Sequence, residues 1–511
     1  MKTLKKAMSV LVSLLMIFTF ALPAFADSAT PQAVATYSIK INKAAGTYKA
    51  YQVFKGDLNG NTLSNVVWGD GVTPFVFEGN TTAASIAKLV GTYSDNSEQL
   101  KTFAAAAAAA VIDGKETSTA MANEGVAELT GLTAGYYVIK NFDVGATQAI
   151  SSYILNVAQN VTIENKASVP SFEKKVKDIN DTTDTDASAW QDSADYDIGD
   201  EVPFMLQGTV AQNYDAYKEY YFAFHDVAEK GLTFLPKTVT VYVDNVKISS
   251  GYDVKTDALT DGCTFEVVFN DLKKINSVHA GSVIRVEYSA TLNADAVLGN
   301  QGNVNTAHLE FSNNPNKVHS GSGKPETGNT PDDSVIVFTY QVVVNKTKAN
   351  GEALTGAEFT LEKVLENGTQ KTVAVVKNAD GTAFTFKGLD DGDYILTETV
   401  TPATYNTIEP IRFTVTADHK ITWNGEARNT ILTSLTGNVT SGTADFMPDK
   451  TEGSLTTNVV NQSGATLPGT GGIGTTIFYV IGGLLMAAAA VLLITKKRMN
   501  SDKCSGYNNR E

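Results

Sequence analysis

The sequence contains few of the residues that build disulfide frameworks and metal-dependent active sites. Two cysteines, Cys263 and Cys504, occur in 511 residues, so neither a set of disulfides nor a cysteine-based zinc cluster can organise the fold. The five histidines stand singly, and the sequence has no HExxH, P-loop or paired-histidine spacing. These absences argue against a metallohydrolase or an NTPase, and we assign no cofactor and no metal ligand from the sequence.

Positive charge is also scarce. The chain has 40 Lys and Arg against 55 Asp and Glu, which gives a formal net charge of −15. A chain of this sign repels nucleic acid and anionic lipid, and it suits a solvated surface protein. The chain does have 43% apolar and 9% aromatic residues, enough for packed cores, in a length that suggests about three domains.

The N-terminal segment has the pattern of a secretory signal peptide. Lys2, Lys5 and Lys6 precede an apolar run over residues 8–22, and residues 24–26 read AFA. A charged start, an apolar middle and small residues before the cleavage site are typical of such peptides. We therefore expect residues 1–26 to be a signal peptide and the residues that follow to lie outside the cell.

The C-terminal segment predicts a membrane helix and a short cytoplasmic tail. Residues 473–494 are uncharged and mostly apolar, a run long enough to cross about 30 Å of hydrocarbon as a helix. Lys496, Lys497 and Arg498 follow at once, so the positive-inside rule assigns residues 496–511 to the cytoplasm. The expected transmembrane helix is 472–495.

A short motif stands directly before this helix, because residues 467–471 read LPGTG. Together with the apolar span and the basic tail, it resembles the cell-wall sorting signal of Gram-positive surface proteins. The resemblance implies that a sortase cysteine attacks the carbonyl group of Thr470, releases Gly471 with the tail, and passes the acyl group to an amine. The implied location is the cell wall, with a precursor held transiently in the membrane. The alternative is a plain single-span anchor.

The interior of the chain predicts an all-β protein of tandem immunoglobulin-like sandwiches. Short segments of alternating β-branched residues, separated by turn residues, recur along nearly its whole length. Residues 83–112 favour helix and are interpreted as a helical insertion in the first domain. Composition predicts domains at 27–168, 169–318 and 334–466, with a linker at 319–333.

Three polar residues of the second domain fall on strand faces that are otherwise apolar. Lys174 shares a face with Phe172 and Val176, because side chains alternate along a strand. An unpaired buried ammonium group is costly, so this lysine needs partners. Asp226 and Asn305 lie on apolar faces of two later strands and are the expected partners. Lys175 is the rival lysine, but its parity points outward.

The third domain repeats this arrangement. Lys346 lies on the apolar face of the first strand, and Asn461 on that of the last. Between them, residues 394–405 read YILTETVTPATY and resemble the E-box of pilins, YxLxETxAPxGY, with Thr401 and Thr404 in place of Ala and Gly. Glu398 is the acidic residue of this motif.

These segments resemble those of Gram-positive sortase-assembled major pilins. Residues 170–176, 224–234 and 305–315 look like the isopeptide-forming middle domain, and the third domain looks like a collagen-adhesin B-type domain. The resemblance implies bonds from Lys174 to Asn305 with Asp226 assisting, and from Lys346 to Asn461 with Glu398 assisting. The alternative is that both sets are ordinary buried polar groups.

Burial of the lysine and the acidic residue would favour the formation of such a bond. Burial lowers the pKa of an amine and raises that of a carboxyl group, so a proton can pass from one to the other and leave a neutral nucleophile. The protein would perform this reaction once, during folding. It would not be an enzyme in the ordinary sense.

The acceptor amine for Thr470 is sought at the end of the first domain. Residues 161–166 read VTIENK, and alternation points Lys166 outward. Its place matches the pilin motif VxVYPKN, whose lysine serves a class C sortase, although the tyrosine and proline are replaced here. A solvated linker lysine is the alternative. Lys174 is the next candidate if it is not consumed internally. Separately, alternation points Asn165 inward, where it could accept a lysine in an isopeptide bond within the first domain, but the sequence offers no convincing partner lysine.

The sequence therefore indicates a structural backbone subunit of a cell-wall-anchored pilus that supports adhesion. The implied partners are further copies of the chain, a class C sortase, a housekeeping sortase and peptidoglycan. Accessory pilins and host surface ligands are further candidates, and nucleic acid is not. A wall-anchored adhesin that does not polymerise, or that sits at a pilus tip, is the alternative. The sequence has no motif of a catalytic cleft that would support a third hypothesis, a secreted enzyme.

Overall fold

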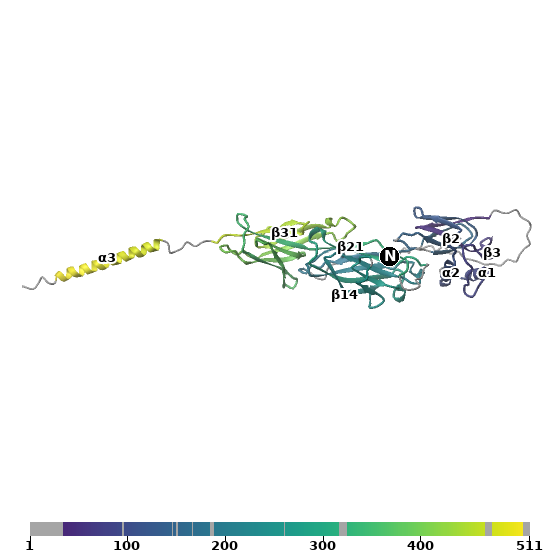
Figure 1. Ribbon diagram of the computed structural model, residues 1–511, viewed down its shortest axis with the longest axis horizontal. Coiled ribbons are helices and arrows are strands. Elements are labelled where there is room, and N and C mark those ends of the chain that lie inside the picture. Colours follow the sequence, from purple (N-terminus) through teal and green to yellow (C-terminus); the bar gives the residue numbers. More distant parts are fainter. Residues whose placement is uncertain are drawn as a thin grey trace, which may run out of the picture.

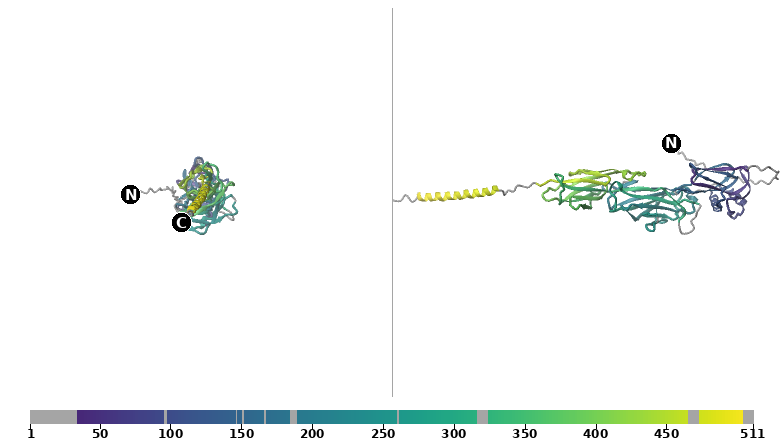
Figure 2. Two further views of the ribbon diagram at one scale, coloured as in Figure 1. Left: turned by 90° about the vertical axis from the view of Figure 1, so that its left-hand side faces the viewer. Right: turned by 45° about the horizontal axis from the view of Figure 1, so that its top comes forward.

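The computed structural model describes residues 34–94, 97–145, 147–149, 152–165, 167–183, 189–259, 261–315, 324–464 and 473–503. Three β units follow one another along the molecule, and one long helix stands apart beyond the third unit (Figures 1 and 2). The predicted signal peptide, the LPGTG segment and residues 504–511 lie outside the described residues. The all-β expectation with a C-terminal apolar helix is confirmed.

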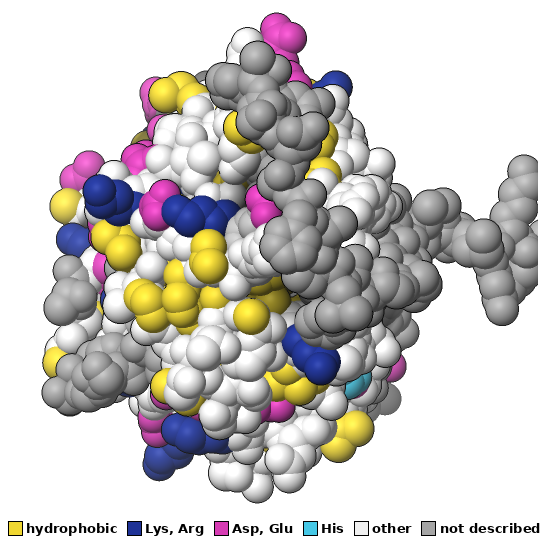
Figure 3. Space-filling view, turned by 90° about the vertical axis from the view of Figure 1, so that its right-hand side faces the viewer, with side chains coloured by type: hydrophobic (Ala, Val, Ile, Leu, Met, Phe, Trp, Pro, Cys, Tyr) yellow, Lys and Arg dark blue, Asp and Glu magenta, His cyan; other side chains and the backbone are white. Residues whose placement is uncertain are grey.

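The first unit packs a three-stranded sheet, of order β5-β1-β8, against a five-stranded sheet that contains β3-β2-β6-β7 and β4. Its strands are β1 (Tyr37–Asn42), β2 (Thr47–Asn59), β3 (Thr62–Trp68), β4 (Ser118–Met121), β5 (Val126–Leu132), β6 (Gly135–Phe142), β7 (Ser152–Val157) and β8 (Val161–Glu164). Figure 3 views the end of the molecule formed by this unit, where hydrophobic side chains gather between charged ones.

Two helices lie within the interval for which the sequence predicts helix. They are α1 (Ala83–Val90) and α2 (Glu98–Ala109), and the hydroxyl groups of Thr82 and Ser97 cap their first turns. Phe103 of α2 is fully buried and packs against Phe54 and Tyr136 of the five-stranded sheet. Both helices therefore cover one side of this sheet (Figure 1).

The middle unit is a sandwich of a six-stranded sheet, β10-β9-β12-β18-β14-β15, and a seven-stranded sheet, β11-β21-β19-β13-β17-β16 with β20 beside β19. The first sheet contains β9 (Ser171–Lys177), β10 (Trp190–Gln191), β12 (Glu201–Thr209), β14 (Leu232–Val243), β15 (Val246–Ile248) and β18 (Val283–Leu292). The second contains β11 (Ser193–Asp195), β13 (Phe222–Ala228), β16 (Asp253–Lys255), β17 (Phe265–Phe269), β19 (Asn303–Ser312), β20 (Thr327–Asn329) and β21 (Asp333–Phe338).

The third unit packs two five-stranded sheets, β25-β26-β22-β31-β30 and β24-β23-β27-β28-β29. The first contains β22 (Tyr340–Lys348), β25 (Val375–Lys377), β26 (Ala383–Leu389), β30 (Met447–Asp449) and β31 (Ser454–Asn461). The second contains β23 (Glu358–Val364), β24 (Gln370–Val373), β27 (Gly392–Val400), β28 (Ile411–His419) and β29 (Leu432–Ser441). β22 and β31 are parallel neighbours.

The junction between the middle and third units differs from the sequence expectation. The sequence predicts that the third domain begins at residue 334, but the structure has two strands here, β21 and β22, in different sheets. β21 pairs with β19, so the middle sheet extends beyond the expected end of the linker at residue 333. Val335 and Val337 enter the middle core, whereas Ile336 and Phe338 enter the third core. One strand thus serves two cores, because its faces alternate.

Short 3₁₀ helices occupy several connections, at Tyr214–Ala216, Leu272–Lys274, Gly299–Gln301 and Arg428–Thr430. The last long element, α3 (Ile473–Lys503), contains a stretch, Thr476–Met499, that is long and apolar enough to cross a membrane. None of this stretch is buried against the β units. Its length and composition agree with the expected membrane anchor.

Candidate functional site

Lys174, Asp226 and Asn305 come together inside the middle unit. Lys174 lies on β9 of the six-stranded sheet, whereas Asp226 and Asn305 lie on β13 and β19 of the facing sheet. All three side chains are fully buried. Nζ of Lys174 donates a hydrogen bond to Oδ2 of Asp226 at 2.5 Å. The three residues singled out in the sequence therefore meet between the two sheets.

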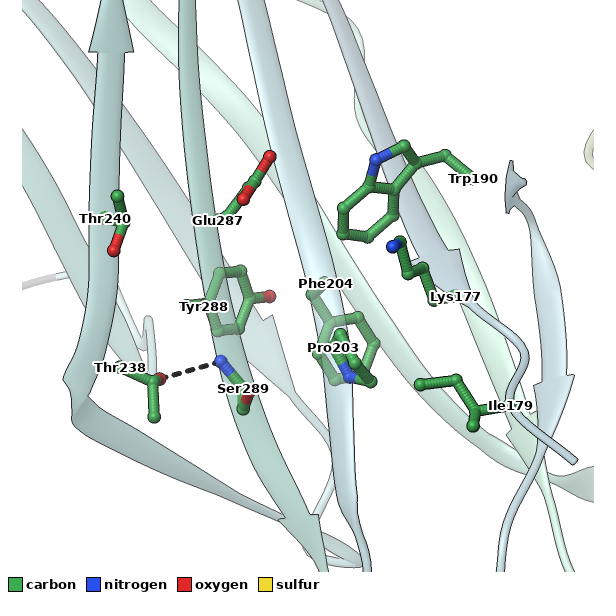
Figure 4. Close-up of a pocket in the computed structure, with 10 residues that line it drawn as sticks. All are labelled: Lys177, Ile179, Trp190, Pro203, Phe204, Thr238, Thr240, Glu287, Tyr288 and Ser289. Carbon is green, nitrogen blue, oxygen red and sulfur yellow. Dashed lines mark hydrogen bonds between the residues drawn. The ribbon is translucent and has the colours of Figure 1, made fainter. Parts of the chain in front are cut away.

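Tyr288 completes this cluster, although the sequence analysis did not single it out. Its hydroxyl group accepts hydrogen bonds from Nζ of Lys174 and Nδ2 of Asn305, each at 2.9 Å, and donates one to Oδ2 of Asp226 at 2.6 Å. Tyr288 lies on β18, where alternate residues are buried, so strand parity was the signal available in the sequence. Figure 4 shows its ring beside that of Phe204 on the neighbouring strand.

The electrostatics of this cluster weaken the charged form of the amine. Burial lowers the pKa of Lys174, and the negative charge of Asp226 offsets only part of this effect. Oδ1 of Asp226 and Oδ1 of Asn305 are buried and have no hydrogen-bond partner among the described residues. Each such atom calls for an explanation, and the groups around it are able to react with one another here.

Lys175, the rival lysine, points away from this cluster. Its Nζ lies 2.6 Å from Oδ1 of Asp192, and a quarter of its side chain is exposed. Although burial opposes the charge, the hydrogen bond and charge of Asp192 raise the pKa of Lys175. Lys175 is therefore a protonated ion-pair partner, in agreement with its outward parity.

The open side of the six-stranded sheet carries a shallow pocket near this cluster. Its lining includes Lys177, Trp190, Phe204 and Tyr288 (Figure 4). Nζ of Lys177 lies 5.3 Å from the centre of a Trp190 ring, a cation–π distance. The rings of Phe204 and Tyr288 thus line this pocket, and the hydroxyl group of Tyr288 belongs to the Lys174 cluster.

Lys346, Glu398 and Asn461 come together in the third unit. Lys346 and Asn461 are fully buried, and Glu398 is nearly so. Nδ2 of Asn461 donates to both carboxylate oxygens of Glu398 at 3.0 Å. Nζ of Lys346 donates to the carbonyl oxygen of Val459 at 2.8 Å, because β22 and β31 are aligned with Lys346 opposite Val459.

This second lysine also has a depressed pKa. Burial lowers the pKa of Lys346 to about 8, against the opposing influence of Glu398. Oε2 of Glu398 also accepts hydrogen bonds from Oγ1 of Thr401 at 3.2 Å and from the backbone N–H of Ile408 at 3.3 Å. Thr401 is one of the two departures from the E-box pattern, and its hydroxyl group helps to orient the carboxylate.

A third buried lysine, Lys363, behaves differently. It lies at the junction with the middle unit, where its Nζ contacts the carboxylates of Asp181, Asp197 and Asp390. Although burial opposes the charge, Asp390 and the other two carboxylates raise the pKa of Lys363. The Lys363 ammonium group is therefore a protonated ion-pair partner of carboxylates from two units. No asparagine side chain bonds to it in the described part of the chain.

The residues expected to link one chain to another fall outside the described residues: Lys166, Thr470 and Gly471. β8, just before Lys166, shows the predicted alternation over residues 161–164. Asn165 donates through Nδ2 to the carbonyl oxygen of Lys43 at 3.1 Å. Within the described part of residues 34–165, the buried polar side chains include no lysine.

Three family matches cover separate parts of the chain. Residues 198–315 match the family described as Gram-positive pilin backbone subunit 2, Cna-B-like domain, and residues 459–501 match the LPXTG cell wall anchor motif. Residues 340–428 match the SpaA family, a prealbumin-like fold domain. The chain is a Gram-positive backbone pilin with a cell-wall anchor. The Cna-B-like match lies in the middle unit of this pilin, whereas the sequence analysis assigned that likeness to the third.

Two relatives extend over most of the pilin. The trypsin-resistant surface T6 protein of Streptococcus pyogenes serotype M6 is 26% identical over 531 aligned positions, which cover 88% of this chain and 92% of that one. The solved T6 backbone pilin of serotype M6 Streptococcus pyogenes superposes with a TM-score of 0.57 at 19% identity, covering 85% of this pilin and 100% of that chain. That structure is described as modular, with three domains decorated by variable loops and extensions.

Proposed function

We propose that this pilin forms a covalent polymer, joined head to tail through Thr470 and Lys166, and that each subunit carries two internal lysine–asparagine isopeptide bonds. The observation that supports the internal bonds is the pair of buried clusters around Lys174 and Lys346. In each, a buried lysine with a lowered pKa lies in one cluster with a carboxyl group and an asparagine.

The proposed reaction exchanges one amide for another. A proton passes from the lysine ammonium group to the carboxylate, and the neutral Nζ attacks Cγ of the asparagine. The new C–N bond forms while Nδ2 departs as ammonia with the proton that the carboxyl group had taken, and Nζ gives up a second proton, which passes to the carboxylate. The net change is lysine plus asparagine giving an amide and one NH₃, with no oxidant or cofactor. Asp226 and Glu398 act as the proton carriers.

The bonds would carry tension around each sandwich. The bond from Lys346 to Asn461 would join β22 to β31, the first and last strands of the third unit, and would shield residues 347–460 from force. The bond from Lys174 to Asn305 would join the two sheets of the middle unit. By analogy with a disulfide closing a loop of this size, each bond adds up to about 4–5 kcal/mol of chain-entropy stabilisation.

The proposed polymer uses one sortase reaction repeatedly. A class C sortase cleaves after Thr470 and passes the acyl group to Lys166 of the next copy, and a housekeeping sortase attaches the last copy to peptidoglycan. Head-to-tail contacts of this kind grow without closing, as a fibre requires. The first domain limit, 27–168, and a role in surface adhesion, with accessory pilins, belong to the same proposal, whereas the expected second boundary at 318–334 is replaced by one after β21.

The experiment that tests polymerisation is electrophoresis of cell-wall extracts after boiling in detergent. The wild-type chain should give a ladder of high-mass species. Lys166→Ala should collapse the ladder to single subunits, whereas Lys40→Ala, an exposed lysine on neighbouring β1, should leave it unchanged. A wild-type extract with single subunits only would instead favour the alternative of a lone wall-anchored adhesin.

A further inference from the structure

A group of metal-ligating side chains lies on the outer face of the seven-stranded sheet of the middle unit. On β13, Asp226 points into the core, so the preceding residue, His225, points to the opposite face. His225 is nevertheless buried, with 5% of its surface exposed. Its Nδ1 lies 2.6 Å from Oδ2 of Asp261 and 3.6 Å from Sγ of Cys263, which belong to the segment before β17.

His308 brings a second imidazole to this group. It lies on β19 directly opposite His225, and the two rings stack with centroids 4.9 Å apart and planes 4° apart. One potential ligand atom from each of His225, His308 and Asp261 lies within 4.8 Å of the others.

Both imidazoles also have a carboxylate that can fix their orientation. Oε2 of Glu310 lies 3.3 Å from Nε2 of His225, and Oδ1 of Asp332 lies 3.3 Å from Nδ1 of His308. Histidines that ligate a metal almost always bond their other ring nitrogen to a carboxylate, a carbonyl or water, which fixes the tautomer. The pattern around His225 and His308 is therefore that of a supported ligand pair.

We propose that His225, His308, Asp261 and Cys263 bind one zinc ion. Two imidazoles, one carboxylate and one thiolate form a four-ligand set that suits Zn²⁺, whereas Ca²⁺ and Mg²⁺ need six or more oxygen ligands. In a tetrahedral zinc site, neighbouring ligand atoms are roughly 3.3–3.8 Å apart. The separation of Sγ of Cys263 from Nδ1 of His225 falls in this range, which adds Cys263 to the group of His225, His308 and Asp261. Nδ1 of His225 and Oδ2 of Asp261, now hydrogen-bonded at 2.6 Å, would move apart by about 1 Å on zinc binding.

The site accounts for an isolated cysteine in a secreted chain. Cys263 is the one cysteine between the expected signal peptide and the sorting motif, so it has no partner for an internal disulfide. On zinc binding, Cys263 loses its thiol proton, and the ion replaces the proton shared by His225 and Asp261. The ion then ties the segment before β17 to β13 and β19. One of its ligands, His225, is the neighbour of Asp226 on β13. Zinc binding does not require the proposed isopeptide bond to form.

Zinc content and affinity test the proposal directly. Untagged pilin released from the cell wall is stripped with a chelator, reloaded with zinc sulfate, dialysed and analysed for metal, and its affinity is measured against a chromophoric chelator. The expected result is one zinc per subunit, with affinity reduced at least about 10–100-fold in His308→Ala and Cys263→Ser, since loss of an outer-shell partner alone has an effect of that size. The control is His279→Ala, an exposed histidine of the same unit, which should bind zinc as the wild type does.

Cobalt substitution provides a second readout that does not depend on folding stability. Co²⁺ in the wild-type site should show a thiolate-to-metal charge-transfer band and the visible bands of a tetrahedral ion. Cys263→Ser should lose the first and keep the second. Zinc below 0.1 per wild-type subunit, or wild-type affinity in the His225→Ala/His308→Ala double variant, would overturn the proposal.

Discussion

Tyr288 joins Lys174 to Asn305 through a single oxygen atom. Nζ of the lysine and Nδ2 of the asparagine each donate to its hydroxyl group at 2.9 Å, and the hydroxyl group itself donates to Asp226 at 2.6 Å. One oxygen thus touches the amine, the carboxamide and the carboxylate of the proposed reaction. Because both lone pairs and the proton of this hydroxyl are used, it holds the other three groups in fixed positions.

Tyr288→Phe should slow the formation of the middle-unit bond. The phenyl ring keeps the packing against Phe204 but removes the hydroxyl group that orients Lys174 and Asn305. We expect bond formation to slow about tenfold or more, followed as loss of ammonia by intact-mass spectrometry after refolding. Tyr242→Phe, on the outer face of the same sheet, is the matched control. Equal rates in Tyr288→Phe and the wild type would show that the hydroxyl group only packs.

Removal of one asparagine should remove one bond at a time. A soluble chain covering residues 27–466, made without sortase, should have a mass about 34 Da below that calculated from its sequence, one ammonia for each of two bonds. Asn305→Ala and Asn461→Ala should each keep a deficit of about 17 Da. A wild-type mass equal to the calculated value would exclude both bonds.

Glu398→Gln should abolish the third-unit bond and leave the middle-unit bond intact. The amide keeps hydrogen-bond contacts to Asn461 but no longer accepts a proton from Lys346. The chain should retain one extra ammonia, and the third unit should lose up to about 4–5 kcal/mol of stability. Glu409→Gln, an exposed residue near the same loop, is the control and should behave as the wild type. Unchanged ammonia loss in Glu398→Gln would assign proton transfer to another group.

The free lysine in Asn461→Ala should make stability depend on pH. Burial lowers the pKa of Lys346 to about 8 in the folded chain, below the ordinary value of 10.5 for an unfolded one. Between these values the unfolded state binds more protons, so the free energy of unfolding should rise as the pH increases from about 8 to 10.5. Lys346→Met/Asn461→Ala lacks the amine and provides the reference. A constant difference between the two variants across this range would contradict the prediction.

Lys363→Met should loosen the junction between the middle and third units. The substitution leaves Asp181, Asp197 and Asp390 without the buried cation that they share. We expect the opening free energy of β23 and β27 to fall by about 3–5 kcal/mol, measured by hydrogen exchange. Lys371→Met removes a lysine that is 42% exposed and should have a smaller effect. Equal protection in the two variants would place the stability of the junction in its apolar contacts.

Much of each lysine cluster could be anticipated because strand parity is local. Lys174 and Lys346 alternate with apolar residues, so a β prediction alone indicates that they point inward. Tyr288 follows the same rule, but an inward tyrosine looks like an ordinary core residue until its hydroxyl partners are known. The extension of β21 into the middle sheet was missed because strand pairing depends on which chain segment lies alongside.

The sequence by itself determined the order of the parts: a leader, β-rich domains, a sorting motif, an apolar helix and a basic tail, because these are properties of contiguous segments. It also determined which lysines face inward. Only the tertiary structure decided which distant groups meet. It placed His225 opposite His308, and Lys363 among aspartates of the middle and third units. Such meetings depend on sheet register and on packing between units, and neither is encoded in the spacing of residues along one strand.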